Sequence, residues 1–538
     1  MKATSDDHQT TFLASVFDPP TDDYFQGYCF FGYDLIFGTQ GALKYSSQTG
    51  KTIPGGLDGR YVKISRQNNA YVFDTDFAGY EVLYYYHDGS TWVVSNSFSQ
   101  VVDYLRLHGI TITPNYTHLS LMTHRRMPAQ QLFSFETIAR EIRVAPPAFS
   151  MIVLPNRIVL KRRAKSDGEI KNYTQALTAH LDLWIGRFQT LMLDKTADFT
   201  TELTGGVDSR ANLVLLVAAK KRLGKEGKQP RIVSNTGSRY EADLNIALSL
   251  AKYYGFKLND KREIKTYELS GSERFQTFRD LSLGVYYPLY FPVKGPSPTD
   301  ISISGGGGGI HRRIYETMHK TDDINRLIQT YADKAGHPEY RFEFIRDANR
   351  MLDLIIEPGD DPLRVLLRDG RVRYHTGRAA RFATSFAPLH STSASRAQLN
   401  AGEDRLEQGQ FNYDIMYSID PDLVDMSYDV SSKSPNDSVR RNLVAAPIHN
   451  SAAPGKVWMG SLALKRSLAP KNSNLYSEVQ DALDRACDNP FVTTFWSKNL
   501  VKDAQALAAT LNSGESIGNA INGLPIHALL AADLVTPS

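Results

Sequence analysis

The segment at residues 198–224 constrains the fold more than any other part of this sequence. Residues 199–203 alternate in polarity, which is typical of a short strand. Gly205 and Gly206 follow at once, and an amphipathic stretch with a basic end occupies residues 209–222. The segment therefore predicts a strand, a tight loop and a helix.

The chemistry of this loop suits a phosphate group. Gly205 and Gly206 let backbone N–H groups turn outward, and the helix that begins near Ser209 adds a partial positive charge at the same place. Thr204 and Ser209 add hydroxyl donors. Asp208 is an anion in this setting, and it fits if a divalent metal lies between it and the phosphates. The loop therefore predicts a site for pyrophosphate with Mg²⁺.

Residues 204–210, TGGVDSR, closely resemble the SGGxDS loop of the ATP pyrophosphatase (PP-loop) superfamily, and the surrounding chain is similar to the asparagine synthetase and β-lactam synthetase group. The resemblance implies that ATP with Mg²⁺ activates a carboxylate as its acyl-adenylate and that an amine then displaces AMP. It also implies that Asp208 holds the metal. The residues that it places around the nucleotide are Leu203, Thr204, Gly205, Gly206, Val207, Asp208, Ser209, Arg210, Thr236, Gly305 and Gly306.

Composition allows two or three domains in the 538 residues. The formal charge of +3 is small for this length, so composition does not favour nucleic acid as the main partner. The two cysteines make neither a disulfide framework nor a cysteine zinc site. Because the first residues lack a signal-peptide pattern and no run approaches a membrane span, we expect a cytoplasmic protein without a membrane partner. The sequence leaves open whether the protein forms a homo-oligomer.

Residues 1–165 contain many short β-like runs between Gly, Pro, Asn and Asp clusters. Residues 57–64, LDGRYVKI, and 72–96, VFDTDFAGYEVLYYYHDGSTWVVSN, resemble passages of the glutaminase-like domain in asparagine synthetases. The resemblance implies an Ntn-hydrolase-like αββα sandwich. A working glutaminase of this type uses an N-terminal cysteine. Position 2 is Lys2, and Cys29 lies inside the chain, so we expect an inactive domain in which Cys29 is a buried core thiol.

Residues 166–538 are expected to form the synthetase domain. Strand candidates at 199–203, 231–235 and 300–304 are separated by helical segments, which is typical of a parallel sheet. With the resemblance, this pattern predicts an α/β fold with a doubly wound ATP-pyrophosphatase sheet and a helical C-terminal part. Ligands bind beyond the carboxyl ends of such strands. We therefore expect the nucleotide in the loops that follow them.

Five consecutive glycines occupy residues 305–309. The similar passage of asparagine synthetases reads SGEGADE, whose first glutamate belongs to catalysis and whose aspartate helps to hold the metal. Aligning Ser304 with its serine places Gly306 and Gly309 at these two acidic positions. Glycines let a backbone approach a phosphate but offer no metal-binding side chain. Either another acid or histidine completes the metal site, or arginines meet the phosphate charge; the candidates are Asp243, Glu241 and His311 for the first and Arg210, Arg312 and Arg313 for the second.

Residues 321–538 show mostly helical periodicity. Helices are expected at 324–335, 341–356, 397–417, 474–487 and 499–511. The segment at 361–391 is rich in arginines and resembles the part of asparagine synthetase-like chains that covers the active site. Its arginines offer donors to a carboxylate or phosphate, although charge runs are usually solvated; they are Arg371, Arg373, Arg378 and Arg381.

Four further residues are candidates for catalysis. The related synthetases use a late lysine to stabilise charge on the phosphates or the tetrahedral centre. The nearest candidates here are Lys456 and Lys465, and neither is in strict register. Tyr315 and Glu316 follow the glycine run and are the nearest acid/base pair.

These features together predict an ATP-dependent, AMP-forming carbon–nitrogen ligase that acts in biosynthesis. Its substrates would be a small-molecule or peptide carboxylate and an amine, without glutamine hydrolysis. An intramolecular cyclase and an intermolecular ligase both stay open. The alternative is a catalytically degenerate asparagine synthetase homologue that binds a nucleotide or a partner protein, since positions 306, 309 and 310 carry no acidic residue.

Overall fold

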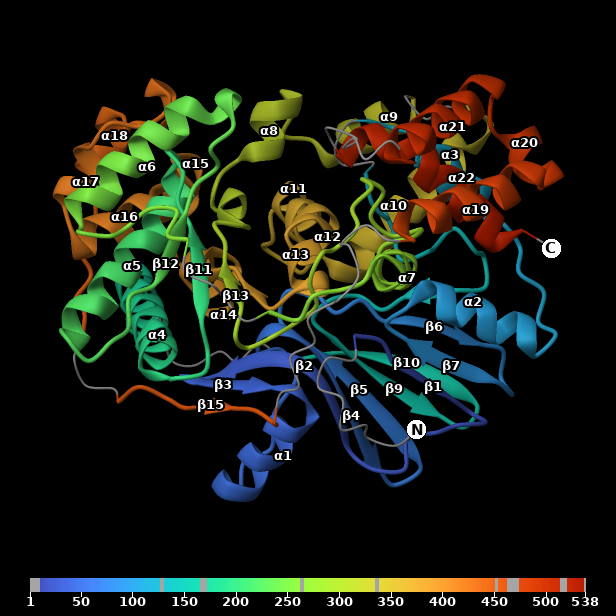
Figure 1. The fold of residues 1–538 in the computed structure, drawn as a ribbon, viewed down its shortest axis with the longest axis horizontal. Helices are drawn as coiled ribbons and strands as arrows, with labels where there is room; N and C mark the ends of the chain where they lie inside the picture. Colours follow the sequence, from blue (N-terminus) through green and yellow to red (C-terminus); the bar gives the residue numbers. More distant parts are fainter. Residues whose placement is uncertain are drawn as a thin grey trace.

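A computed structural model describes residues 10–125, 130–164, 172–261, 266–333, 338–449, 453–461, 474–512 and 520–536. Figure 1 shows the N-terminal strands as the lower layer of the molecule and most helices above them. The described residues form sheets of four, seven and four strands. The mixed α/β class expected from the sequence is confirmed.

Two mainly antiparallel sheets form most of the N-terminal half. The first has the order β1 (Leu13–Ser15), β7 (Trp92–Ser95), β6 (Tyr84–His87), β8 (Arg143–Val144). The second has the order β10 (Arg157–Arg162), β9 (Phe149–Leu154), β5 (Ala70–Thr75), β4 (Asp58–Gln67), β2 (Tyr24–Phe31), β3 (Asp34–Phe37), β15 (Val457–Trp458). One hydrophobic cluster contains Val94 from the first sheet and Val62 and Met151 from the second. The two sheets therefore pack face to face.

The third sheet is parallel, as the sequence predicts. Its order is β12 (Arg231–Val233), β11 (Phe199–Glu202), β13 (Ile301–Ile303), β14 (Ser385–Phe386). Strand β12 pairs with one edge of β11, and β13 pairs with its other edge. The strand order therefore reverses at β11 and β13. The sequence did not predict β14, which is only two residues long.

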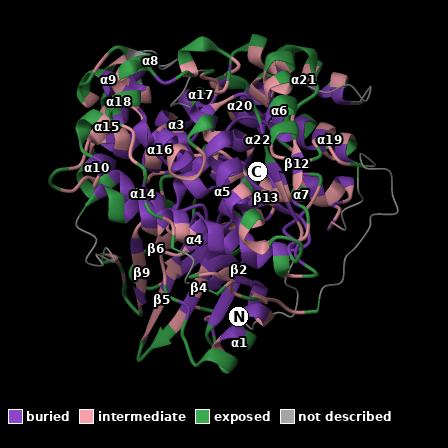
Figure 2. Cartoon of the chain, turned by 90° about the vertical axis from the view of Figure 1, so that its left-hand side faces the viewer, coloured by how far each residue is buried: buried purple, intermediate pink, exposed green. Residues whose placement is uncertain are grey.

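The helix α4 (Tyr173–Leu193) lies between the two halves of the molecule. The largest hydrophobic cluster contains Phe30 of β2, Trp184 of α4 and Leu213 of α5 (Val207–Leu223). Figure 2 shows α4 within the buried centre of the molecule. Residues 173–192 carry apolar side chains on one helical face, which is typical of a helix packed on one side. Most of its residues are buried instead, because the seven-stranded sheet covers a second face.

Polar contacts also join the halves. The Tyr28 hydroxyl accepts a hydrogen bond from the backbone N–H of Ser385 in β14 (2.8 Å). Asp58 pairs with Arg187 of α4 (2.7 Å) and accepts from the backbone N–H of Thr392 (2.7 Å). In addition, β15 comes from the second region of the expected division but pairs with β3. These contacts hold the parallel sheet in a defined position on the N-terminal sheets.

Helices dominate the rest of the described chain. None of those in the described ranges combines the length and apolar character required to cross a bilayer. The remaining α-helices are α1 (Gly38–Thr49), α2 (Phe98–Leu107), α3 (Tyr116–Leu121), α6 (Glu241–Tyr253), α7 (Gly271–Leu281), α8 (Ile314–His319), α9 (Ile324–Ala332), α10 (Arg341–Ile355), α11 (Pro362–Val365), α12 (Arg373–His375), α13 (Gly377–Phe382), α14 (Thr392–Leu399), α15 (Glu403–Glu407), α16 (Gln410–Ile419), α17 (Asp422–Asp425), α18 (Asp437–Arg441), α19 (Leu475–Asp488), α20 (Pro490–Phe495), α21 (Lys498–Asn512) and α22 (Leu524–Val535). A π-helical turn, η4 (Leu366–Val372), joins α11 to α12, and a 3₁₀ turn, η5 (Pro388–His390), precedes α14.

The single helix expected at 397–417 is wrong. The structure has three helices there, α14, α15 and α16. Gly402 and Gly409 lie between them with φ of +75° and +63°. Positive φ interrupts a right-handed helix, and glycine adopts it without steric cost. The apolar periodicity continued across both interruptions and concealed them.

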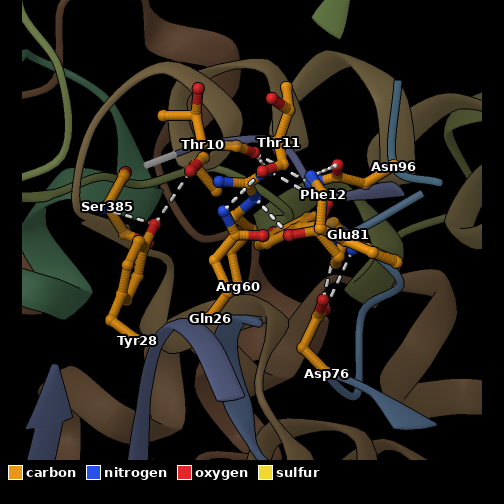
Figure 3. Close-up of polar contacts among 12 residues, drawn as sticks. Thr10, Thr11, Phe12, Gln26, Tyr28, Arg60, Asp76, Glu81, Asn96 and Ser385 are labelled. Carbon is orange, nitrogen blue, oxygen red and sulfur yellow. Dashed lines mark hydrogen bonds and ion pairs between the residues drawn. The ribbon is translucent and has the colours of Figure 1, made fainter. Parts of the chain in front are cut away.

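A buried ion pair anchors the beginning of the described chain (Figure 3). Arg60 and Glu81 are each 1% exposed, and the Arg60 Nε lies 2.7 Å from the Glu81 Oε2. The Asn96 amide donates to the same carboxylate (2.9 Å), and both Arg60 and Asn96 donate to the carbonyl of Thr10. Burial raises the pKa of Glu81, while Arg60 opposes that shift. The cluster fixes the segment before β1 against the sandwich.

Replacing Arg60 with methionine should therefore lower the free energy of unfolding by about 3–5 kcal/mol, because Glu81 would remain buried without its cation. The matched control is Arg279→Met, which breaks the exposed Arg279–Asp103 pair (2.9 Å) and should cost less than about 1 kcal/mol. Urea unfolding of both variants measures the difference. Equal, small losses would show that the buried pair does not anchor the segment.

Candidate functional site

The loop after β11 lies at the reversal point of the parallel sheet. Open α/β sheets bind ligands in the crevice at such a point, beyond the carboxyl ends of the strands. Gly206 is the N-cap of α5, so the first turn of that helix begins inside the loop. The Ser209 hydroxyl accepts from the backbone N–H of Thr204 (3.1 Å) and lies 3.2 Å from the Gly206 carbonyl. Ser209 thereby holds the loop against the helix.

The glycine run packs against the loop after β11. It follows β13, and the Asn212 side chain of α5 donates to the Ser304 carbonyl (2.8 Å), which ties the two loops together. A Cβ on Gly308 would lie 2.4 Å from the Cγ of Asp208, and one on Gly307 would lie 2.3 Å from the Cβ of His390. The absence of side chains in this run therefore allows close backbone approach on both sides.

Asp208 has two polar partners at the bottom of the crevice. Its carboxylate forms an ion pair with Arg312 and accepts from the Asn412 amide (2.7 Å). Burial raises the pKa of the half-buried Asp208 carboxyl, while Arg312 and Lys433 oppose that shift.

A second group of charges lies beside the two loop glycines. The backbone N–H of Gly205 donates to the carboxylate of Asp243 (2.9 Å). A Cβ on Gly205 would lie 2.4 Å from the Cβ of Asp429, and the Lys433 Nζ lies 3.7 Å from the Cβ position of Gly206. Asp429 and Lys433 form an ion pair of 2.5 Å. The loop therefore faces both acidic and basic side chains.

Sequence reasoning missed most of these partners. Asn412, Asp429 and Lys433 come from α16 and from the segment that follows α17. No motif or spacing marks them, because only the packing of α16 against α5 brings them to the loop. Asp243 was a candidate metal ligand. Its carboxylate instead accepts a hydrogen bond from the backbone N–H of Gly205.

Arg210 stabilises the segment that follows α17, beside the loop. It is fully buried, and it donates to the carbonyls of Met426 (3.0 Å) and Ser427. Its guanidinium lies 3.7 Å from the ring centroid of Tyr428. These contacts fix the segment that presents Asp429, so Arg210 acts as a positioning residue and does not face the crevice.

Among the predicted nucleotide-binding residues, the structure places residues 203–209 beside Gly305 and Gly306. The Leu203 side chain is fully buried, and its N–H donates to the Val233 carbonyl of β12 (2.8 Å). Thr236 is exposed in the segment after β12, at the same end of the sheet. The loop predicted from the sequence therefore lies beyond the carboxyl ends of the parallel strands.

The four predicted catalytic residues do not assemble around Asp208. Tyr315 is 1% exposed in a hydrophobic cluster with Leu327 and Phe344, so it is a core residue. Glu316 interacts with Arg313 on the same turn of α8 (3.6 Å). Lys456 lies beside β15, with its ammonium 5.7 Å from the Trp458 ring centroid. Lys465 lies outside the described residues.

The remaining candidates for metal or phosphate contact are engaged elsewhere. His311 is buried, with its Nε2 2.7 Å from the Leu389 carbonyl. Arg313 pairs with Glu403 and Glu407 (both 2.8 Å). Glu241 is exposed at the start of α6. Within the described ranges, no three side chains of His, Cys, Asp or Glu are grouped to hold a metal ion. Asp208 thus offers one carboxylate to a metal, and Arg312 provides charge where a second carboxylate is absent.

The arginine-rich segment is more buried than its composition suggests. Arg373 donates to the carbonyls of Gly79 (2.9 Å) and Ala145 (3.0 Å) and joins η4 and α12 to the N-terminal half. Arg371 donates to the Gln131 side chain (3.0 Å). The expected solvated face is wrong for these two residues, which are 1% and 7% exposed.

In the N-terminal half, Cys29 is fully buried in β2, which confirms the predicted core thiol. Burial raises the pKa of this thiol far above its ordinary value. A buried, protonated thiol is a poor nucleophile. Lys2 lies outside the described residues.

Comparisons with known proteins add little to this geometry. No protein-family model matches the sequence, and no curated protein matches it. One similar solved structure is described as the allosteric regulatory enzyme of purine biosynthesis, with 12% identity over 49% of this chain and 45% of the other. Another is the glutamine phosphoribosylpyrophosphate amidotransferase from B. subtilis complexed with ADP and GMP, with 11% identity over 49% of this chain and 46% of the other. This chain thus matches less than half the length of either protein, and the TM-score of 0.13 in both cases is too low to carry an argument.

Proposed function

We propose that this chain is an ATP-dependent, AMP-forming amide-bond ligase of the asparagine synthetase-like kind. It would adenylate a small-molecule or peptide carboxylate in the cytoplasm and transfer it to an amine without hydrolysing glutamine. The N-terminal sandwich would be an inactive Ntn-hydrolase-like domain, and the parallel sheet a PP-loop domain. One observation carries the proposal: Asp208 of the TGGVDSR loop lies against the glycine run at the reversal point of the parallel sheet.

In this proposal the protein contributes alignment and charge. The N–H groups of Gly205 and Gly206 at the start of α5 would hold the departing pyrophosphate. Arg312 and Lys433 would add positive charge beside it, and arginine suits this role because it offers forked donors to phosphate oxygens. Asp208 would hold Mg²⁺, which neutralises phosphate charge when bound. Fixed charges of this kind act strongly in a site that excludes water.

A second candidate function is nucleotide or partner binding without catalysis. It is favoured by the hydrogen bonds that the loop already makes within the chain. The Gly205 N–H donates to Asp243, and the Gly206 N–H donates to the Thr204 hydroxyl (3.2 Å). A phosphate must displace both acceptors before it reaches these donors.

A pyrophosphate-release assay with ATP, Mg²⁺ and a panel of carboxylic acids and amines separates the two functions. For the ligase, we expect acid-dependent release that falls at least about a hundredfold in Asp208→Ala, because that residue would organise the phosphates. The matched control is Asp103→Ala, which removes a carboxylate from the exposed pair with Arg279 and should leave release unchanged.

Calorimetric ATP titration completes this test. Binding of ATP without pyrophosphate release from any acid would support the second candidate. If ATP does not bind to the wild-type protein, the ligase and nucleotide binding are both contradicted, and only partner binding is left. Equal release by wild type and Asp208→Ala would contradict the role of the loop.

A further inference from the structure

A cavity of about 240 Å³ lies at the junction of the N-terminal sandwich and the helical region. Phe77 and Ala78 line it from the loop after β5, and Arg163 lines it from the end of β10. His390 of η5 and Ser395 of α14 form the opposite side. The cavity therefore depends on both halves of the molecule, and its walls come from segments that are distant in the sequence.

The charges in the cavity leave one cation in excess. Four arginines and three carboxylates line it: Arg162, Arg163, Arg368 and Arg396, with Glu357, Asp360 and Asp369. Arg368 binds Asp369 through two hydrogen bonds (2.6 and 2.8 Å), and Arg162 lies 3.4 Å from Glu357. These pairs neutralise most of the charge, so a ligand with a single negative charge would balance the rest.

Among the described residues Arg163 forms no ion pair, although its charge acts on the buried carboxyl of Asp76. It donates to the backbone carbonyls of Phe149 (2.9 Å) and Asp76 (3.2 Å). The turn that faces it contains Gly56, whose φ is +80° and whose Cβ position lies 3.4 Å from the Arg163 Nε. A guanidinium keeps its charge in any protein environment. Arg163 is therefore a partly buried cation that can accept an anion.

His390 lines the same cavity with a buried ring. It is 4% exposed, and its Nδ1 lies 2.8 Å from the Tyr80 hydroxyl. Burial lowers the pKa of His390 to about 3, so the ring is neutral near pH 7. The buried Tyr80 hydroxyl is protonated, and its proton has no other acceptor in the described chain, so Nδ1 accepts it. The ring proton then lies on Nε2, which has no partner among the described residues.

Phe77 lies beside both His390 and the segment that Arg163 binds. Its ring centroid is 6.2 Å from that of His390, and the carbonyl of the preceding residue, Asp76, accepts from Arg163. Apolar groups of Pro147, Ile355 and Leu399 complete the lining. A ligand that fits this arrangement has an anionic acceptor at one end and a short hydrocarbon part at the other.

We propose that the cavity is a binding site for a small monocarboxylate with a short apolar chain. Its carboxylate accepts hydrogen bonds from Arg163, and its chain packs on Phe77. This assignment does not depend on the proposed nucleotide chemistry, because neither Asp208 nor the glycines of the two loops line the cavity.

Ligand-observed NMR titration of the full chain tests the assignment. The probes are hexanoate, the neutral hexanamide of the same length, and inorganic phosphate. We expect hexanoate to bind, and we expect hexanamide and phosphate to bind at least about tenfold more weakly, because charge-assisted hydrogen bonds to a carboxylate are the stronger ones. Equal binding of hexanamide would overturn the carboxylate assignment, preferred binding of phosphate would overturn the monocarboxylate, and no hexanoate binding would overturn the site.

Variants locate the binding. Arg163→Gln should weaken hexanoate binding at least about tenfold by removing the unpaired cation. Ser395→Phe should abolish binding by filling the cavity, and it keeps the proposal testable if Arg163→Gln does not fold. Arg157→Gln is the matched control, since it removes an exposed arginine from the same strand, outside the cavity. Unchanged binding in Ser395→Phe, or equal losses in Arg163→Gln and Arg157→Gln, would overturn the location.

Discussion

Replacing Gly308 with alanine should lower the affinity for ATP at least about a hundredfold, equivalent to about 2.7 kcal/mol. The new Cβ would lie 2.4 Å from the Cγ of Asp208 and within 2.7 Å of both carboxylate oxygens. Asp208 cannot move aside freely, because Arg312 and Asn412 hold its carboxylate. The substitution must therefore separate the glycine run from the loop after β11, and the proposed phosphate site requires both.

Gly305→Ala is the matched control. A Cβ at Gly305 would lie 3.3 Å from the Cβ of Asp208 and 3.4 Å from the Ser209 nitrogen, which requires a shift of only a few tenths of an ångström. We expect its ATP affinity to stay within about fivefold of wild type. Calorimetric titration with ATP and Mg²⁺ measures both variants, and thermal unfolding shows whether each is folded. Wild-type affinity in a folded Gly308→Ala protein would contradict the proposed crevice.

Acidification from pH 7.5 to 5.5 should lower the free energy of unfolding by about 4 kcal/mol. Five buried histidines cause the loss. Burial lowers the pKa of four of them to about 3 and that of the fifth to about 4; they are His118, His180, His390 and His527, and then His311. An unfolded histidine titrates near 6.5, so below that pH the unfolded chain binds protons that the folded chain excludes.

The sign of this effect follows from proton uptake. Each histidine with a lowered pKa contributes stability that is present above pH 6.5. This stability is lost below pH 6.5, at about 1.4 kcal/mol per pH unit. Buried acids act in the opposite direction, most strongly the two with the largest shifts, because burial raises the pKa of Asp76 to about 7 and that of Asp414 to about 6. Their stabilising protons bind as the pH falls, which offsets about 3 of the roughly 7 kcal/mol that the histidines lose.

Urea unfolding at pH 7.5, 6.5 and 5.5 measures this dependence. His118→Gln removes one of the buried rings, and its amide can still reach the Ser134 hydroxyl that contacts His118 (3.1 Å). We expect the variant to lose about 1.4 kcal/mol less than wild type between pH 7.5 and 5.5. Equal stability of the wild type at the three pH values would contradict the prediction, because a net loss of 4 kcal/mol is a large part of the 5–15 kcal/mol typical of a folded protein.

The strand, loop and helix at 198–224 could be predicted because their signals are local. Alternation over 199–203, the two glycines and the helical periodicity each depend on neighbours a few residues away. The parallel sheet followed from the alternation of strands with helices. Periodicity failed at Gly402 and Gly409, where a single backbone angle ends a helix without changing the apolar pattern.

The partners of the loop could not be predicted in the same way. Arg312 and Asn412 are 104 and 204 residues from Asp208. Local patterns also misplaced Tyr315, which follows the glycine run but points into a core of helices α9 and α10. A polar side chain near a motif has many reachable partners, and only packing selects among them.

The sequence by itself determined the local elements of this protein: a loop able to present backbone amides, the strand and helix that flank it, and a buried thiol at Cys29. Only the tertiary structure decided what faces that loop and what lies between the two halves. The physical reason is the separation along the chain over which each interaction acts. Backbone preferences and periodic burial act over a few residues, whereas ion pairs and cavities arise where distant segments exclude water together.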